Sequence, residues 1–408
     1  MAALDPPLAR PPARPVARFL DRATPPHVAT LVLVTGLTAL ATSIFLPSLS
    51  QMAEDLGTSY ATMQLAVSGF LGMNAVLQLL VGPLADRWGR RPVLLAALGV
   101  FVLATLGTCL ARDAATFLAF RMLQAACAAN VVLARAVVRD MVPEAEAASV
   151  IGYVTMGMAL VPMIGPAVGG LLDEAWGWRA SFGLLLGAGV LVLLLVALDG
   201  GETARGGGRS FREQTRVYPL LLRSRRFWGF ALCATFASGA FFALLGGASY
   251  VAGEVFGLSA LWTGVALGAP AVGYAGGNFL SGRYAARVGT ARMALMGCLV
   301  AVAGLGASLL ATLGGGASAW SFFGFCVALG VGNGLALPSA TAGSISVRPD
   351  LAGTASGLSA ALMTAGGAAL SLLAAALLDG ALSPWPLQAL MVGSSALGAL
   401  SLLLLRET

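Results

Sequence analysis

The sequence GPLADRWGRRP, residues 82–92, lies between two long apolar runs, residues 62–81 and 93–110. Apolar runs of about 20 residues are long enough to cross a bilayer as helices, so the few polar residues between them predict a tight transmembrane hairpin. Gly82 and Gly89 allow the backbone to turn sharply, and the two prolines of the stretch are expected to end or begin helices. The net positive charge of the turn predicts that it faces the cytoplasm.

The composition is that of a membrane protein. Of the 408 residues, 58% are hydrophobic and 10% are charged, and the mean hydropathy is +0.86. Soluble proteins carry about 25% charged residues, so most of this chain is expected to lie in lipid. The net charge of +6 comes from arginines in short loops, which indicates membrane topology rather than a nucleic-acid-binding face. The five cysteines lack metal-ligand spacing, so no metal site is predicted.

The apolar runs predict twelve transmembrane helices with both chain ends in the cytoplasm, because the count is even and arginines concentrate in the loops assigned inside. Residues 1–27 are expected to form a mobile cytoplasmic tail. Residues 199–226 are expected to form a cytoplasmic linker that ends in an amphipathic helix on the membrane surface. The linker separates two six-helix bundles, 28–198 and 227–408. The predicted spans are 28–49, 60–81, 92–111, 115–138, 147–171, 180–198, 227–252, 260–281, 292–312, 318–340, 353–378 and 385–405.

The two halves repeat each other. A shift of 200 positions places Gly82 on Gly282 and Gly89 on Gly289, although the second copy lacks the acidic residue of the first. Such a repeat is expected of transporters whose halves rock about a central site. Composition and periodicity therefore predict an all-α polytopic membrane protein with two pseudo-symmetric bundles.

The pattern G-x-L-A-D-R-x-G-R-R, from residue 82 to residue 91, resembles the signature loop between the second and third spans of the major facilitator superfamily. The resemblance implies a twelve-helix transporter that exposes a central site to each side of the membrane in turn. It also implies that the aspartate pairs with arginines, caps helix ends and latches the two halves on the cytoplasmic side. The residues given this gate role are Gly82, Asp86, Arg87, Gly89, Arg90 and Arg91.

Arg121 lies near the outer third of the fourth predicted span. A charge at such a depth costs roughly 2.5–3.5 kcal/mol on insertion scales, so it is expected to face a watery cavity or a partner. The alternative is an arginine that extends to the outer interface. The sequence R-x-x-Q resembles a fourth-span motif of the proton-driven exporters in the superfamily, which implies a role in proton transfer for Arg121 and a supporting role for Gln124.

The fifth predicted span contains the sequence GMALVPMIGPAVGG, residues 157–170. Proline inside a helix removes a backbone hydrogen bond, and glycine admits a neighbouring helix closely. The stretch therefore predicts a kinked, tightly packed helix, and it is similar to the antiporter motif of exporters in the superfamily. A kinked helix without that role remains the alternative. The residues concerned are Pro162, Gly165, Pro166, Gly169 and Gly170.

The end of the first span, ATSIFLP, resembles the bicyclomycin/chloramphenicol-resistance branch of the superfamily. Ser43 stands where that branch usually has an aspartate, and Phe45 where it has a tyrosine. No acidic residue lies in the middle of any predicted span, and arginine cannot exchange a proton at physiological pH. Proton coupling would therefore use an acid at a span end, such as Asp140, Glu54 or Asp173, or be unusual or absent.

Amides and aromatic side chains within the spans are candidates for a substrate cavity. Buried amides in lipid must find polar partners, so they either line a cavity or join helices. Aromatic and thioether side chains suit an adaptable binding site, although a lipid-facing surface would have the same composition. The candidates are Ser43, Phe45, Asn130, Tyr153, Met156, Phe236, Phe241 and Asn333.

The sequence has no phosphate-binding loop and no nucleophile elbow, which disfavours an ATP-driven pump or any other enzyme. The resemblance implies a secondary active exporter of small, fairly apolar compounds, such as amphenicols or dyes, in exchange for protons. Alternatives are an exporter or importer of one polar metabolite (a sugar, an amino acid or a siderophore) and a receptor that transports nothing. The expected partners are a small-molecule substrate, protons and the lipid of a bacterial inner membrane; the expected state is monomeric, without cofactor or nucleic acid.

Overall fold

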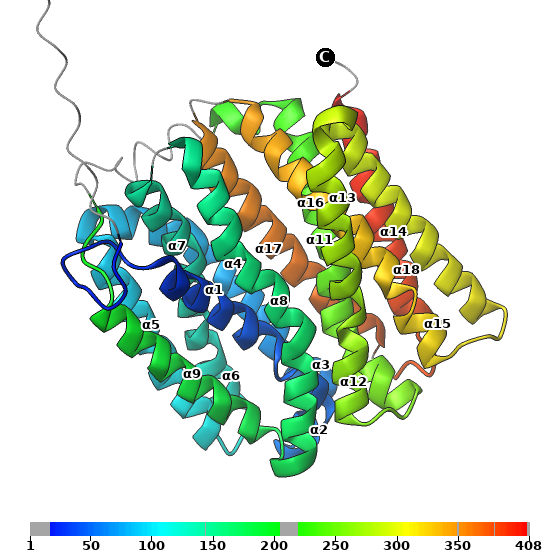
Figure 1. The fold of residues 1–408 in the computed structure, drawn as a ribbon. Coiled ribbons are helices and arrows are strands. Elements are labelled where there is room, and N and C mark those ends of the chain that lie inside the picture. Colours follow the sequence, from blue (N-terminus) through cyan, green and yellow to red (C-terminus); the bar gives the residue numbers. More distant parts are fainter. Residues whose placement is uncertain (1–16, 143, 205–218, 349–350, 379, 406–408) are drawn as a thin grey trace, which may run out of the picture.

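The computed structural model describes residues 17–142, 144–204, 219–348, 351–378 and 380–405, and within these ranges every regular element is a helix. Figure 1 shows the helices as a bundle of long rods that run in roughly the same direction. Ten helical stretches in the described ranges are long and apolar enough to cross a membrane. The chain is therefore an all-α polytopic membrane protein, and this prediction is confirmed.

The first half of the chain forms the predicted spans one to six. Several spans are interrupted by a short change of helix type, so that α1, η1 and α2 make one continuous stretch, as do α3 with α4, and α6 with η2 and α7. The elements are α1 (Val28–Ser43), η1 (Leu46–Ser48), α2 (Leu49–Asp55), α3 (Tyr60–Met63), α4 (Leu65–Trp88), α5 (Arg90–Leu110), α6 (Ala114–Gln124), η2 (Ala125–Cys127), α7 (Ala128–Met141), α8 (Glu144–Trp176) and α9 (Arg179–Leu198).

The second half forms the predicted spans seven to twelve. Two predicted spans, 147–171 in α8 and 260–281 in α12 and α13, are not among the ten stretches that are long and apolar enough to cross a membrane, but both are helical in the structure. The elements are α11 (Arg225–Tyr250), η3 (Val251–Val255), α12 (Ala260–Leu267), α13 (Ala269–Val288), α14 (Thr290–Leu313), α15 (Ala319–Phe323), α16 (Cys326–Ser346), α17 (Ala352–Leu378), α18 (Trp385–Ser401) and η5 (Leu402–Leu405).

The hairpin between α4 and α5 is tighter than the sequence predicts. Pro83 lies inside α4, which continues to Trp88, so the expectation that this proline ends the helix is wrong. Gly89 alone makes the turn, because its φ of +96° is a conformation that side chains with a Cβ rarely adopt. Its N–H donates a hydrogen bond to the carbonyl of Ala85 at 3.0 Å. Gly289 makes the same turn between α13 and α14, with a φ of +88°, so the repeat seen in the sequence recurs in the backbone.

The two halves meet closely at the end of the molecule where α2, α3 and α12 lie (Figure 1). Helix α8 packs against α12, α4 packs against α17, and α11 contacts α2 and η1. The Tyr60 hydroxyl donates to the carbonyl of Gly246 at 3.1 Å. On the α8–α12 side, the backbone N–H of Leu261 donates to a carboxylate oxygen of Glu174 at 3.1 Å. Polar contacts therefore join the halves at this end.

The sides of the bundle are covered by large apolar side chains. Leu103 of α5 is 68% exposed, Phe279 of α13 is 68% exposed and Leu310 of α14 is 71% exposed. Apolar surface on this scale is unusual for a protein in water and is solvated by lipid chains in a bilayer. Trp176 and Trp320 are also exposed and lie at or near helix ends, where tryptophans anchor membrane helices at the interface.

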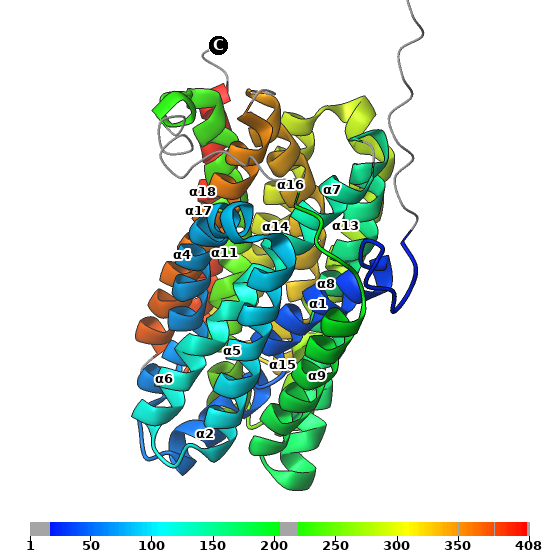
Figure 2. The same cartoon turned by 90° about the vertical axis from the view of Figure 1, so that its left-hand side faces the viewer.

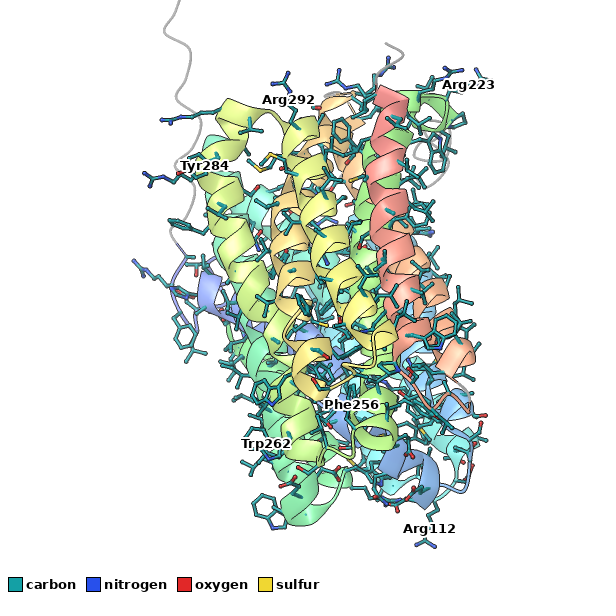
Figure 3. All side chains as sticks on the ribbon, turned by 90° about the vertical axis from the view of Figure 1, so that its right-hand side faces the viewer. Arg112, Arg223, Phe256, Trp262, Tyr284 and Arg292 are labelled. Carbon is teal, nitrogen blue, oxygen red and sulfur yellow. The ribbon has the colours of Figure 1, made fainter. Side chains whose placement is uncertain are left out.

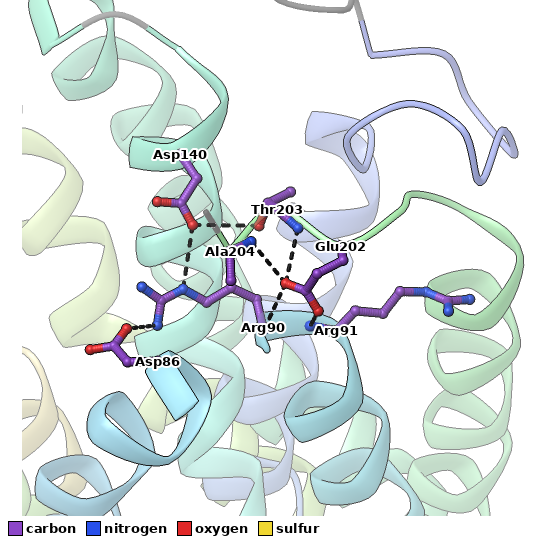
Figure 4. A network of polar contacts seen from close by, with 7 residues as sticks. All are labelled: Asp86, Arg90, Arg91, Asp140, Glu202, Thr203 and Ala204. Carbon is purple, nitrogen blue, oxygen red and sulfur yellow. Dashed lines mark hydrogen bonds and ion pairs between the residues drawn. The ribbon is translucent and has the colours of Figure 1, made fainter. Parts of the chain in front are cut away.

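The two ends of the bundle differ in charge. Figure 3 places Arg223 and Arg292 at the end that carries the α13–α14 turn, and Arg112 at the opposite end. Figure 4 adds Arg90 and Arg91, beside the α4–α5 turn. This distribution agrees with the expectation that the hairpin turns face the cytoplasm. The orientation in the membrane stays a prediction.

The described part of the N-terminal tail is held against the first bundle. One carboxylate oxygen of Asp199, just after α9, accepts the N–H of Leu20 at 2.7 Å. The other accepts the N–H of His27 at 2.9 Å and the hydroxyl of Thr30 at 2.6 Å. Figures 1 and 2 show the blue loop of this tail beside the green segment that follows α9. The prediction of a mobile tail is therefore wrong for residues 17–27. Residues 1–16 and most of the expected linker helix lie outside the described residues.

Candidate functional site

A cavity of about 230 Å³ lies between the two halves. Its walls come from α1, α4, α7 and α8 of the first half and from α11, α12, α13 and α17 of the second. The lining is mainly apolar, and its polar groups are hydroxyls and amides. No acidic or basic side chain is among the described residues that line it. The polar lining residues are Thr38, Thr42, Ser43, Asn74, Gln78 and Thr364.

Two of the predicted cavity residues, Ser43 and Phe241, line this cavity. Phe45 does not line it; the side chain is fully buried and packs on Phe182. Asn130 is also fully buried, and its amide donates to the hydroxyl of Thr38 at 3.2 Å, so it joins α7 to α1. The other candidates lie elsewhere: Phe236 and Asn333 are not among the lining residues, and the side chains of Tyr153 and Met156 lie outside the described part of the chain.

The residues that line the cavity follow a pattern visible in the sequence, in which polar residues recur four positions apart within one span. Thr38 and Thr42 are four residues apart on α1, and Asn74 and Gln78 are four residues apart on α4. Residues at this spacing share one face of a helix. Phe70 lies one turn before Asn74 on the same face and also lines the cavity. Polar residues repeated at this interval inside a span therefore mark the cavity better than single amides do.

Arg121 is fully buried at the end of α6, which excludes the alternative that it extends to the interface. Its Nε donates to the carbonyl of Ala66 at 3.0 Å, and one Nη donates to the carbonyl of Ala41 at 2.8 Å. The guanidinium carbon lies 4.4 Å from the ring centre of Phe45 and 3.9 Å from that of Phe70. The charge is therefore held by neutral carbonyls and aromatic faces, directly behind a wall of the cavity.

Gln124 completes this arrangement from the next turn of the same helix. Its side-chain oxygen accepts a hydrogen bond from the other Nη of Arg121 at 2.7 Å. Its amide nitrogen donates to the hydroxyl of Thr105 on α5 at 2.8 Å, and that hydroxyl donates onward to the carbonyl of Phe101 at 2.6 Å. The chain of donors fixes the amide so that its oxygen points at the guanidinium. The structure therefore brings Arg121 and Gln124 together, as the R-x-x-Q spacing predicts.

The glycines of α8 are places of close helix approach. A Cβ on Gly169 would overlap the carbonyl oxygen of Ile44, and a Cβ on Gly170 would overlap the carbonyl oxygen of Ala260. Gly165 faces the hydroxyl of Ser43 on α1. The two prolines of the motif, Pro162 and Pro166, lie inside the helix and line the cavity. Gly165 and Gly169 therefore allow α8 to pack closely against α1, and Gly170 allows it to pack closely against α12.

Three of the predicted gate residues, Asp86, Arg90 and Arg91, make polar contacts at the arginine-rich end and are partly exposed (Figure 4). Asp86 and Arg90 make an ion pair at 2.5 Å, and Nε of Arg90 lies 3.3 Å from a carboxylate oxygen of Asp140 on α7. Arg91 donates to the carbonyl of Ala197 at 2.9 Å. Asp140, a candidate for proton coupling, therefore belongs to this network and not to the cavity. Of the remaining gate candidates, Arg87 is exposed and Gly82 has open space around it.

Glu202, which follows α9, also binds the α4–α5 turn, a contact that the sequence did not indicate. Its carboxylate oxygens accept the backbone N–H groups of Arg90 at 2.8 Å and Arg91 at 3.1 Å. These are the first two residues of α5, whose N–H groups have no partner within the helix, so an anion there also interacts favourably with the helix dipole. A Cβ on Gly89 would overlap the same carboxylate. The described contacts of the gate thus lie within the first half and the linker.

The model of the Major Facilitator Superfamily matches residues 31–371. The chain is 37% identical over 219 residues to a chloramphenicol resistance protein of Pseudomonas aeruginosa. The aligned residues make up 50% of this chain and 49% of that protein. It is 28% identical over 348 residues to multidrug resistance protein D of Escherichia coli (strain K12), covering 85% of this chain and 88% of that one.

A third relative is the MFS-type transporter YdgK of Bacillus subtilis (strain 168), at 33% identity over 247 residues, 59% of this chain and 61% of that protein. The chain thus spans about half to three fifths of the Pseudomonas and Bacillus relatives. Among solved structures, a bacterial homolog of the human lysosomal transporter Spinster, in an inward-facing and unoccupied conformation, has a TM-score of 0.71 at 18% identity and covers 92% of this chain and 95% of that one. At such identity the likeness concerns the fold alone. With the family model matching from α1 to α17, the chain belongs to the major facilitator superfamily.

Proposed function

We propose that this protein exports small, fairly apolar compounds by alternating access, in exchange for protons, across a bacterial inner membrane. The observation that carries the proposal is the cavity between the two halves, which has an apolar lining and a few hydroxyl and amide groups. Sites for drug-sized ligands have this composition. The names of the relatives, which include chloramphenicol resistance and multidrug resistance proteins, support the same substrate class.

The contacts between the halves support an alternating mechanism. The α8–α12 crossing and the polar contacts near Tyr60 close the end opposite the α4–α5 turn. The gate network at the other end makes its described contacts within the first half and the linker. We take the conformation as open towards the cytoplasm, with both termini inside. The proposed unit is a monomer of two bundles, 28–198 and 227–408, joined by the linker 199–226.

Proton coupling is the finer part of the proposal. Since no acid is among the described residues of the cavity wall, we assign the exchangeable proton to Asp140, which shares Arg90 with Asp86. Protonation of Asp140 would weaken its contact with Arg90 and so loosen the network. Arg121 and Gln124 would transmit the state of the cavity to α4 and α5, through Ala66 and Thr105.

The test uses chloramphenicol in an efflux-deficient bacterial host. Expression of the wild-type protein is expected to lower accumulation of the radiolabelled drug, and collapse of the proton gradient is expected to abolish the effect. Asp140→Asn is expected to leave drug binding intact and to remove the dependence on the gradient. Asp55→Asn provides a control with the same chemical change at the opposite end, where the remaining carbonyl oxygen can still accept the hydrogen bond that the indole N–H of Trp178 donates to Asp55 at 2.9 Å. Wild-type accumulation equal to that of the empty host for every apolar drug in a panel would refute the proposal.

A further inference from the structure

The charge of Arg121 is not balanced by an acid. Its three hydrogen-bond acceptors are two backbone carbonyls and the amide oxygen of Gln124. Arginine keeps its positive charge in proteins, including at buried positions. Neither of the two described ion pairs, Asp86–Arg90 and Arg90–Asp140, involves Arg121. A full positive charge therefore remains in a region of low dielectric constant, where its field is weakly screened.

This charge lies next to the cavity. Its guanidinium carbon is 3.9 Å from the ring centre of Phe70, and Phe70 lines the cavity. A ligand atom in contact with that ring would lie about 4 Å from the ring centre, and so within about 8 Å of the guanidinium. The ring of Phe70 already serves as a cation–π partner for Arg121, which makes it a poorer site for a second cation.

The wall offers no group that would compensate a ligand cation. Its described polar groups are three hydroxyls on α1, two amides on α4 and one hydroxyl on α17. The sequence of α8 contains no Asp or Glu between Glu146 and Asp173, the stretch that includes the lining residues Pro162 and Pro166. A desolvated organic cation would therefore lose its hydration without gaining an ionic partner.

We infer that the cavity selects neutral and anionic aromatic compounds and discriminates against organic cations, with Arg121 as the residue that sets this preference. The inference rests on the proposed function, because it concerns the substrates of the same cavity. With an effective dielectric constant of about 20 and a separation of about 8 Å, repulsion from one positive charge weakens binding roughly 30-fold. A ligand anion experiences attraction of the same size, which offsets part of the cost of its dehydration.

The experiment uses three probes that share one fluorophore and differ in charge. Dansyl amide is neutral, dansyl glycine is anionic and dansyl cadaverine is cationic at pH 7. Binding to the purified full-length protein is followed by the rise in dansyl fluorescence, and transport of the same probes is followed in vesicles. The cation is expected to bind at least tenfold more weakly than the neutral probe and at least tenfold more weakly than the anion.

Two variants locate the origin of the preference. Arg121→Gln is expected to bring the cation to within about threefold of the neutral probe. Because that variant removes a buried charge and could misfold, a second one leaves Arg121 in place. Gln78→Glu adds a negative charge to the cavity wall with little change of shape, and is expected to raise cation affinity at least tenfold. Gln51→Glu makes the same change at an exposed position of α2, where it removes only the exposed hydrogen bond to Asp55, and is expected to leave all three affinities unchanged.

The outcomes separate the inference from the proposed function. If the neutral and anionic probes bind and are transported while the cationic probe binds weakly, both the exporter function and the charge preference are supported. A cation that binds as tightly as the neutral probe, or a Gln78→Glu protein with unchanged cation affinity, overturns the charge preference and leaves the exporter intact. Failure of every probe to bind or to be transported overturns the exporter and the preference together.

Discussion

The glycine crossing between α8 and α12 predicts that one methyl group will shift the conformational equilibrium of the protein. In Gly170→Ala, the new Cβ would overlap the carbonyl oxygen of Ala260 and the Cα of Leu261, which are backbone atoms that cannot rotate away. The two helices must separate at the end where the halves meet. The substitution is therefore expected to destabilise the conformation that is closed at this end and to favour the opposite one.

The magnitude follows from the cost of overpacking, which is about 1–3 kcal/mol. Alanine also favours a helix over glycine by about 1 kcal/mol, but α8 is helical in both conformations, so this gain cancels. The ratio of open to closed protein should therefore rise roughly 5- to 150-fold. Gly264→Ala on the facing helix should act in the same direction, because its Cβ would overlap the carbonyl of Pro166.

The assay is the labelling of a cysteine placed at Thr42, which lines the cavity, by a membrane-impermeant maleimide added outside intact cells. Labelling requires the end closed by α8 and α12 to open, so its rate reports the open fraction. Gly187→Ala is the matched control, because its Cβ would meet nothing within 4 Å. A labelling rate in Gly170→Ala equal to that in Gly187→Ala would refute the argument that this backbone contact holds the end closed.

Three further predictions concern Arg121, the linker and pH. Arg121→Lys should reduce chloramphenicol efflux at least tenfold, because one ammonium cannot reach three separated acceptors and each lost charged hydrogen bond costs about 1.5–3 kcal/mol. Glu202→Ala should weaken docking of the linker by about 1 kcal/mol and speed tryptic cleavage after Arg205 roughly fivefold. The pKa of Glu174 is lowered by hydrogen bonds from Ser259 and from the N–H of Leu261. Its stabilising contact is therefore present above the ordinary carboxyl pKa and is lost as pH falls through the lowered value. The distance between spin labels on α8 and α12 should stay constant from pH 8 to pH 5 and lengthen below about pH 4.

Each of these predictions has a specific control. Arg112→Lys makes the same exchange in an exposed loop and should leave efflux unchanged. Glu54→Ala removes an exposed acid at the opposite end and should leave tryptic cleavage unchanged. Spin labels at Trp176 and Trp262, both exposed, measure the distance in the pH experiment. A distance change between pH 8 and pH 5 would contradict the assignment to Glu174, as would an unchanged distance below pH 4.

The sequence predicted the helices and the unusual residues within them, because these depend on local composition. Arg121 was identified since a charge at membrane depth is rare and costly. The glycines of α8 were identified as close-packing residues on the same basis. Their partners could not be predicted, because the carbonyls of Ala41 and Ala66 come from other helices and every residue has a carbonyl. The sequence also placed Phe236 and Asn333 in a cavity whose wall, as described, does not include them.

The acidic residues of the linker were missed for a different reason. Glu202 and Asp199 lie in a polar, glycine-rich segment, where a carboxylate is normally solvated. Their partners are 112 residues away at Arg90 and 172 residues away at His27. These carboxylates bind backbone N–H groups, which every residue except proline has. The sequence therefore shows no pair of opposite charges from which the contacts could be predicted. Proline led to a wrong prediction of a helix end, because Pro83 lies inside α4 and the helix continues past it.

The buried carboxylate of Asp199 has a practical consequence for handling the protein. Its bonds to Leu20, His27 and Thr30 mean that the chain ahead of α1 and the chain behind α9 are fastened at one point. An affinity tag added upstream of residue 17 leaves this fastening untouched. A deletion through residue 27 removes the N–H groups of Leu20 and His27, two of the three hydrogen-bond donors to Asp199, which is 2% exposed. The deletion should therefore lower the yield of folded protein recovered in detergent.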